Sequence, residues 1–498
     1  MEALIVSEIS AVLGNVLARL SFTPDQPLVF SSALFWCLFL IFLPVYALLF
    51  KRRTAMMVFV TLFSVYFYYK CSGWCVLLLL ATSVIDWYLA QQIAATQAVK
   101  RRRWLLAGSV VVSLSILAFF KYSNFIVWNI QALIGGNFQP LDIVLPVGIS
   151  FYTFRSISYV VDVYKGKIEP ENDYLSYLFF LTFFPCLIAG PIVRAADFMP
   201  QLRSLKAPTR EFVYAGLWLV IIGVFKKAVV ADYIAQYNNL IFGNPGGYGA
   251  FESLMGVLGY SMQIYCDFSG YSDMAIGIAM MMGFDLGLNF NFPYKARNIT
   301  DFWHRWHISL STWLRDYVYI PLGGNRRGTA RRYINLMITM LLGGLWHGAA
   351  WKFVIWGAGH GVGLCFHKAM MPLFGRISPN NYAWKLFSWL STFFFVAFLW
   401  IFFRADSFTD ACTIIATIAR GGDTWNGVLT FLVARHTWCF MVALVAVLHF
   451  IPHIFYEDLR EWFVNSLWIT KFLVFLALVQ LVIEFASAEV TPFIYASF

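Results

Sequence analysis

Long apolar runs, separated by short clusters of basic residues, dominate the amino-acid sequence. The first runs cover residues 30–50, 54–69 and 74–93, and the first is close to the ~20 residues that an α-helix needs to cross a membrane. Basic clusters follow the first and third runs, at residues 51–53 and 100–103. Because cytoplasmic loops of membrane proteins are enriched in Lys and Arg, both clusters are predicted to be cytoplasmic. The amino terminus is then predicted to face outward.

Apolar runs continue along the rest of the chain, and several are too short or too long for one straight crossing. Pro146, Pro185 and Pro191 fall in the middle runs, where proline kinks or ends a helix. We predict an all-α polytopic membrane protein with about eleven transmembrane helices plus re-entrant and interfacial helices. No repeat and no linker rich in Pro, Gly or Ser divides residues 28–498, which are predicted to form one domain.

Residues 1–27 are predicted to form an amphipathic extension that lies on the membrane. They lack the basic start and apolar core of a cleavable signal. Their apolar residues at helical spacing are Ala3, Ile5, Val6, Ile9, Val12, Leu13, Val16 and Leu17.

Composition agrees with the membrane class. Hydrophobic residues make up 60% of the chain and charged residues 12%, whereas soluble domains average roughly 45–50% and about 25%. The net charge of +10 is distributed over short loops, which argues for cytoplasmic loops and against nucleic-acid binding. The eight cysteines are scattered without metal-ligand spacing, so no metal site is expected.

Residues 301–317 have the periodicity of an amphipathic helix, for which Thr300 is the predicted N-cap. Placed at ~100° intervals, its large apolar side chains share one arc about 120° wide. His307 lies at the edge of this arc, which by itself favours a hydrogen-bonded boundary histidine. The arc contains Phe302, Trp303, Trp306, Leu310, Trp313, Leu314 and Tyr317.

His347 lies in a long apolar stretch in which Lys352 is the one charged residue. An ionisable group at membrane depth is a functional candidate, and a buried neutral histidine can act as a general base. A structural hydrogen bond between helices explains His347 equally well, so both interpretations stay open on these grounds. His360 is flanked by glycines at 357, 359, 361 and 363, and this favours a role in helix packing.

Five segments taken together resemble the membrane-bound O-acyltransferase family, in particular the bacterial branch that includes alginate O-acetyltransferase. Residues 28–46 also resemble the usual beginning of the family, so the resemblance covers nearly everything after residue 28. The segments are FFPCLIAGPIVR at 183–194, FKKAVVADYIA at 225–235, YCDFSGYSDMAIG at 265–277, DFWHRWHISLSTWLRDYVYIPLGGNRRG at 301–328 and GLWHGAAWKFVIWGAGHG at 344–361.

The resemblance implies roles for two histidines. The buried catalytic histidine of the family corresponds to His347, in a Trp-His-Gly setting, and its second histidine corresponds to His307, in Arg-Trp-His. They are forty positions apart (347 minus 307), so the fold must bring them together. The resemblance also implies a ring of helices around a central tunnel, in which donor and acceptor reach the histidine from opposite faces.

The function expected from the resemblance is O-acyl transfer. A cytoplasmic thioester, acetyl-CoA or another acyl thioester, would donate an acetyl or acyl group towards an exported polysaccharide or a periplasmic acceptor protein, with no bound cofactor. Expected partners are membrane lipids and a periplasmic acetyltransferase or polysaccharide-export proteins, at a bacterial inner membrane. Arg326, Arg327, Arg331 and Arg332 suit the donor's phosphates. The predicted substrate-binding residues are Asp267, Ser269, Trp303, Trp306, Arg315, Asp316, Asn325, Arg326, Arg327 and Trp346.

Three other functions are considered. Teichoic acid D-alanyltransferases share the Trp-His and Asp-Phe-Ser-Gly segments, but they generally lack the loop PLGGNR found here at 321–326. A non-enzymatic transporter or flippase would use the buried histidine and acids as a polar path, and an inverted repeat, which is not found, would favour it. An assembly scaffold for an export complex would need neither histidine.

Overall fold

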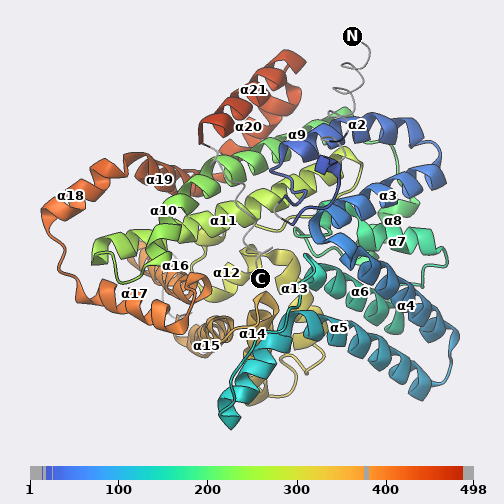
Figure 1. Ribbon diagram of the computed structural model, residues 1–498, viewed down its shortest axis with the longest axis horizontal. Coiled ribbons are helices and arrows are strands. Elements are labelled where there is room, and N and C mark those ends of the chain that lie inside the picture. Colours follow the sequence, from blue (N-terminus) through green and yellow to red (C-terminus); the bar gives the residue numbers. More distant parts are fainter. Residues whose placement is uncertain (1–13, 15–17, 25, 375–380, 486–498) are drawn as a thin grey trace. The chain divides into compact units, whose positions relative to one another are not determined.

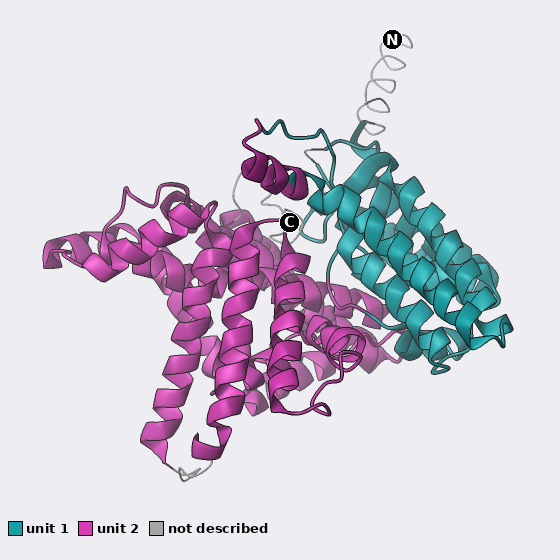
Figure 2. Ribbon diagram, turned by 90° about the horizontal axis from the view of Figure 1, so that it is seen from below, with its two compact units in different colours: residues 1–124, 138–189, 193–205 teal, residues 125–137, 190–192, 206–498 magenta. Residues whose placement is uncertain are grey.

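The computed structural model describes residues 14, 18–24, 26–374 and 381–485 of the chain. Within these residues every regular element is a helix (Figure 1). Of the predicted amphipathic extension at residues 1–27, the structure describes residues 14, 18–24, 26 and 27, and the apolar residues from Ala3 to Leu17 on which the prediction rests lie outside the described residues. The chain divides into two compact units, residues 1–124, 138–189 and 193–205, and residues 125–137, 190–192 and 206–498 (Figure 2). The predicted boundary at residue 28 stays a prediction.

Unit 1 is a bundle of helices that are mostly apolar. Its elements are α2 (Ala33–Leu49), α3 (Arg53–Ser72), η1 (Gly73–Cys75), α4 (Val76–Ala95), most of α5 (Val99–Ile134), α6 (Ile149–Tyr164), α7 (Tyr174–Thr182), η2 (Phe184–Cys186) and α8 (Ala195–Arg203).

Unit 2 contains the end of α5 and the helices from α9 onward. Before the predicted histidines come α9 (Arg210–Val224), the π-helix η3 (Phe225–Ala231), α10 (Asp232–Gly243), α11 (Ala250–Met281) and η4 (Pro293–Lys295). The histidine region contains α12 (Ile299–Arg305), α13 (Ile308–Leu314), the π-helix η5 (Arg315–Tyr319), α14 (Thr329–His347) and α15 (Trp351–Phe374). The last helices are α16 (Tyr382–Arg404), α17 (Phe408–Arg420), α18 (Trp425–Ala434), α19 (His436–Phe450), α20 (His453–Asn465) and α21 (Trp468–Phe485).

Several helices are long and apolar enough to cross a membrane, which makes this a multi-pass membrane protein. In the described residues the five such runs are Arg53–Ala95, Val99–Ile134, Arg210–Gly243, Tyr382–Arg404 and Trp468–Phe485, and the bent pair of α18 and α19 makes up to six. By length and composition alone, the described residues contain fewer candidate spans than the expected number of about eleven transmembrane helices. One reason is that α11, α14 and α15 carry polar residues and glycines within apolar sequence.

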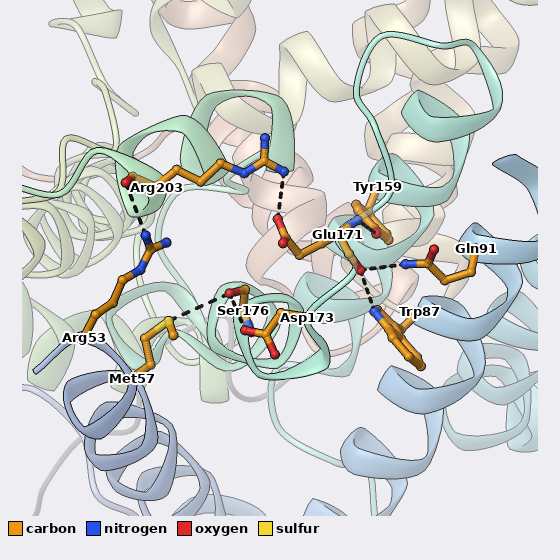
Figure 3. Close-up of polar contacts among 9 residues, drawn as sticks. All are labelled: Arg53, Met57, Trp87, Gln91, Tyr159, Glu171, Asp173, Ser176 and Arg203. Atoms are coloured by element: carbon orange, nitrogen blue, oxygen red, sulfur yellow. Dashed lines mark hydrogen bonds and ion pairs between the residues drawn. The ribbon is translucent and has the colours of Figure 1, made fainter.

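At one end of unit 1, Glu171 makes polar contacts with residues of several elements (Figure 3). Its backbone carbonyl accepts hydrogen bonds from Trp87 Nε1 and Gln91 Nε2, both at 2.7 Å. Its carboxylate pairs with Arg203 at 2.8 Å, and Arg53 donates to the Arg203 carbonyl. The beginning of α3 therefore lies at the same end of unit 1 as the last turns of α4, so the two helices run in opposite directions.

The same end carries the basic clusters of the early topology. Arg102, in the first turn of α5, donates to the carbonyl of Tyr164 at the end of α6 at 2.8 Å. The clusters at residues 51–53 and 100–103 therefore share one end of unit 1. This geometry agrees with the prediction that both face the same side of the membrane.

In unit 2, α9 and α11 run side by side with their backbones in contact (Figure 1). A Cβ on Gly223 would lie 2.6 Å from the Gly270 carbonyl oxygen, and one on Gly216 would lie 2.6 Å from that of Gly277. Small residues allow this approach because they leave room for main-chain packing. The close contact places the acids of α11 against the lysines that follow α9.

Candidate active site

The polypeptide chain breaks at His307, in the middle of the segment expected to be one helix. The structure has α12 and α13 instead, so the prediction of a continuous helix over 301–317 is wrong. His307 adopts a left-handed conformation with φ 43°, which a side chain with a Cβ rarely takes and which interrupts the helical hydrogen bonds. Beyond this residue, the periodicity of an uninterrupted helix no longer describes which side chains share a face.

The segment that precedes η4 binds the chain on both sides of the break at His307. The Asn291 amide donates to the Arg305 carbonyl, and the Ile308 amide donates to the Asn289 carbonyl, both at 2.9 Å. The N-cap of α12 is Asn298, whose side chain accepts from the Asp301 amide at 2.8 Å. The prediction of Thr300 as the cap is wrong, because the Thr300 hydroxyl lies instead 2.9 Å from His367 Nδ1.

His307 is fully buried in unit 2. Its Nδ1 lies 3.2 Å from Asn289 Oδ1, and its ring packs edge-on against Phe268 of α11 at 4.6 Å between centroids. The residue lies outside every candidate span. Burial lowers the pKa of His307 to about 3, because the charged imidazolium would lose its hydration. The ring is therefore neutral at physiological pH.

His347 is the last residue of α14 and is 2% exposed. Its ring lies 4.9 Å from Trp356 of α15 and 5.2 Å from Phe403 of α16. A Cβ on the following Gly348 would overlap the Phe353 ring, at 2.1 Å from its nearest atom. Glycine at this position lets α14 end against α15 with His347 held at the junction.

Trp346 connects the two predicted histidines. Its ring centroid lies 6.0 Å from that of His307 and 5.0 Å from that of His347. The fold therefore brings together two residues that are forty positions apart (347 minus 307). Both histidines are buried and most of the side chains around them are aromatic, so electrostatic interactions in this enclosure are weakly screened.

Aromatic rings from α12, α15 and α16 form the wall of this enclosure. Trp303 packs against Trp356 at 5.8 Å, and Trp306 packs against Trp400 at 5.0 Å. Trp303 and Trp306 were predicted as substrate-binding residues, and the structure places both in the wall that continues to His347. Trp356, Trp400 and Phe403 belong to the same wall, although sequence reasoning did not single them out.

His360 lies behind this wall. Its ring is fully buried 4.6 Å from Trp356 and 5.1 Å from Trp303, and neither ring nitrogen has a hydrogen bond within the described part of the chain. The glycines around it allow close packing, as the sequence predicted. A Cβ on Gly357 would lie 2.4 Å from the Met340 carbonyl oxygen of α14, and one on Gly359 would lie 2.5 Å from Leu399 of α16.

Other predicted substrate-binding residues have local partners. Asp267 pairs with Lys227 at 2.5 Å, and Lys227 also pairs with Asp232 at 2.8 Å. Arg315 pairs with the adjacent Asp316 at 2.6 Å. These contacts show charge compensation, and they do not establish substrate binding.

Ser269 and the Arg-rich loop lie in different surroundings. Ser269 is fully buried on α11. Asn325 accepts from the Tyr319 hydroxyl at 2.5 Å, which orders the loop after η5. Arg326 and Arg327 are exposed on that loop. An exposed pair of arginines on an ordered loop can meet an anionic ligand from solution.

Asn289 is a site residue that sequence reasoning missed. It is 1% exposed and contacts His307 directly. The local sequence NFNF contains no pattern that marks its first asparagine. Within the described residues, no group of three or more His, Cys, Asp or Glu side chains could hold a metal ion.

Comparisons with known proteins agree with the geometry. The sequence model of MBOAT, the membrane-bound O-acyltransferase family, matches residues 170–408, which contain both histidines. The probable alginate O-acetylase AlgI of Pseudomonas aeruginosa is 40% identical over 408 residues, which are 80% of this chain and 76% of that protein.

Two further relatives have other acceptors in their names. The peptidoglycan O-acetyltransferase of Helicobacter pylori is 38% identical over 365 residues, 68% of this chain and 69% of that protein. The teichoic acid D-alanyltransferase of Bacillus subtilis is 28% identical over 349 residues, 65% of this chain and 82% of that protein. Because a relative is 40% identical over four-fifths of this chain, and the family model matches residues 170–408, this chain belongs to the membrane-bound O-acyltransferase family and is an acyltransferase.

Proposed function

We propose that the protein is an O-acetyltransferase of the bacterial cytoplasmic membrane. It takes an acetyl group from a cytoplasmic thioester, acetyl-CoA, and passes it towards hydroxyl groups of an exported polysaccharide, directly or through a periplasmic acceptor protein. The names of the alginate and peptidoglycan relatives support an acetyl group and a glycan acceptor. Membership of the family supports a ring of helices around a central tunnel that admits donor and acceptor from opposite faces.

The observation that carries the proposal is the meeting of His307 and His347 at Trp346. Burying an imidazole in an apolar setting costs free energy, so two buried histidines that meet at one side chain are candidates for chemistry. A neutral imidazole can accept a proton from a hydroxyl group, and buried, apolar surroundings favour the neutral, basic form of the ring.

The proposed reaction balances without a resident metal or cofactor. His347 accepts the proton of the attacking hydroxyl as its oxygen forms a bond to the acetyl carbonyl carbon. The carbon–sulfur bond of the thioester then breaks, and the proton passes from His347 to the leaving thiolate. The products are an acetyl ester and a free thiol. His307 positions the donor, and the exposed arginines of the loop after η5 bind the donor's phosphates.

The test is transfer of labelled acetyl from acetyl-CoA by the detergent-purified full chain, followed together with release of the free thiol. General-base catalysis contributes about 10²- to 10⁴-fold, so His347→Gln should lose at least about 10²-fold in rate. His360→Phe is the matched control, because His360 is also buried in this region but lies behind the wall. Wild-type activity in a folded His347→Gln protein would exclude the proposed role.

The role of the arginines has its own test, which separates the phosphates from the thioester. Arg326→Gln with Arg327→Gln should raise KM for acetyl-CoA and leave KM for acetyl-pantetheine unchanged, because acetyl-pantetheine lacks the nucleotide phosphates. Arg420→Gln, at an exposed position that ends α17, is the control. Equal effects on the two donors would remove the loop from phosphate binding.

D-alanyl transfer is the alternative that a comparison favours, through the teichoic acid relative. It predicts activity with a D-alanyl thioester in place of acetyl-CoA. A transporter predicts solute movement without thioester consumption, so a folded protein that consumes neither thioester but moves a solute would support that function.

A further inference from the structure

Asn289 uses its whole side chain to hold the break at His307. Its Oδ1 accepts from the Ser309 amide at 3.2 Å and from the Ser309 hydroxyl at 2.8 Å, and it lies 3.2 Å from His307 Nδ1. Its Nδ2 donates to Ser272 Oγ of α11 at 3.0 Å. Asn289 is 1% exposed, so these contacts lie inside unit 2. One buried amide thus joins α11, the histidine and the first turn of α13.

The orientation of this amide follows from its partners. The Ser309 backbone N–H can only donate, so the atom that faces it must be the carbonyl oxygen of Asn289. The opposite orientation would place two donors against each other and leave a buried amide N–H unsatisfied. Oδ1 therefore also faces His307 Nδ1.

This orientation determines where the proton of neutral His307 lies. An unprotonated Nδ1 would turn a lone pair towards the lone pairs of Oδ1 at 3.2 Å. The Ser309 hydroxyl does not offer a better arrangement, because its one proton goes to Oδ1 at 2.8 Å rather than to Nδ1 at 3.4 Å. Its oxygen meanwhile accepts from the Ile192 amide at 2.9 Å. Nδ1 must carry the proton, and Nε2 must carry the lone pair.

We propose that Asn289 is a positioning residue that holds His307 in the Nδ1–H tautomer, so that the donor meets a lone pair on Nε2. This inference rests on the proposed function. A neutral His307 in this tautomer accepts a hydrogen bond at Nε2 and cannot donate one there. It therefore cannot bind the thioester carbonyl oxygen, which only accepts. The donor group that it positions is an amide N–H of the pantetheine arm.

Nitrogen NMR on the full chain in detergent, with ¹⁵N-labelled histidine, tests the tautomer directly. The signals of His307 are identified among the eight histidines as those missing in His307→Gln. We expect the proton on Nδ1 in the wild type and a mixture of both tautomers in Asn289→Leu. A wild-type proton on Nε2 would overturn the inference.

Kinetics with two variants tests the consequence for the enzyme. Asn289→Leu removes the acceptor, and we expect kcat/KM to fall about 10- to 100-fold, mainly through KM for acetyl-pantetheine. Asn289→Asp keeps the acceptor and adds a negative charge beside Nδ1, which stabilises the imidazolium. We expect the acid limb of the pH profile of kcat/KM to shift to higher pH by about one to three units. A structural role alone would not move this limb.

Asn238→Leu is the matched control, because Asn238 is also fully buried in unit 2 and bonds to Gln263 at 2.7 Å. The inference is wrong if Asn289→Leu lowers kcat/KM by the same factor as Asn238→Leu and Asn289→Asp leaves the acid limb of the pH profile unchanged. Asn289 would then have a structural role only. The proposed function can fail separately. A wild-type protein that holds the proton on Nδ1 but transfers no acetyl would support the tautomer of His307 and contradict the acetyltransferase function.

Discussion

The ammonium group of Lys227 lies 2.5 Å from a carboxylate oxygen of Asp267, and both side chains are buried, at 3% and 2% exposure. Lys227 belongs to the π-helix η3 and Asp267 belongs to α11, so the pair links two elements across unit 2. Lys227 also pairs with Asp232, and the adjacent Lys226 pairs with Asp273 at 2.7 Å. The acids that look isolated in the sequence therefore have counter-charges in the structure.

Removal of Lys227 should destabilise the protein more than removal of Asp267. Lys227→Met leaves the buried carboxylate of Asp267 and the partly buried carboxylate of Asp232 without this counter-charge, and breaking a buried pair costs about 3–5 kcal/mol. Asp267→Asn leaves Lys227 with Asp232, so its cost should be smaller. The measurement is thermal unfolding in detergent, monitored by size-exclusion chromatography. Equal stability of both variants, with a raised KM for the donor only in Asp267→Asn, would instead support a direct substrate contact.

The glycine contact between α9 and α11 should tolerate no side chain. In Gly223→Ala the new Cβ would lie 2.6 Å from the Gly270 carbonyl oxygen and 2.8 Å from the Met274 amide nitrogen, both main-chain atoms that cannot move aside. We expect a loss of about 1–3 kcal/mol in unfolding free energy. Gly108→Ala in α5 is the control, because nothing lies within 4 Å of its Cβ, and it should be neutral or slightly stabilising. Similar effects of the two changes would argue against backbone contact.

His360→Phe should keep acetyl transfer and should not lower the thermal stability. The ring stacks against Phe302 at 6.0 Å, and phenylalanine keeps an aromatic ring there while it removes two buried polar nitrogens. The melting temperature and the transfer rate are measured on the same preparation. A dead but folded His360→Phe protein would place this histidine in the chemistry and would exclude it as a control for His347.

The pH dependence of stability should report the burial of His307. Its pKa is lowered from 6.5 to about 3 in the folded protein, so below pH 6.5 the unfolded chain binds a proton that the folded chain does not. The stability contributed by the neutral ring is complete above pH 6.5 and falls as the pH drops towards 3. Relative to His307→Gln, the wild type should lose about 2 kcal/mol between pH 7.5 and pH 5.

Denaturant titrations of both proteins in detergent check this prediction. A difference between wild type and His307→Gln that stays constant across this range would mean that the imidazole is solvated. The same shift implies that His307 does not titrate between pH 6 and pH 8, so any activity change in that range must come from another group.

The class of the protein and its candidate catalytic residue follow from the sequence alone. Apolar runs of membrane-spanning length determine a multi-pass membrane protein, and the basic clusters at residues 51–53 and 100–103 predict its early topology. Both depend on residues that are neighbours along the chain. The five segments that resemble the family, one of which contains His347, pointed to it for the same reason, because the residues of each segment are contiguous.

Only the tertiary structure decided how the site is built. A helix projection assumes unbroken helical hydrogen bonds, and the left-handed turn at His307 breaks them through contacts with Asn289, eighteen positions earlier (307 minus 289). The partners of Asp267 and the role of Trp346 as the link between the two histidines likewise depend on which elements pack together. Such contacts leave no periodic pattern in the sequence, because each depends on the packing of segments that are far apart along the chain.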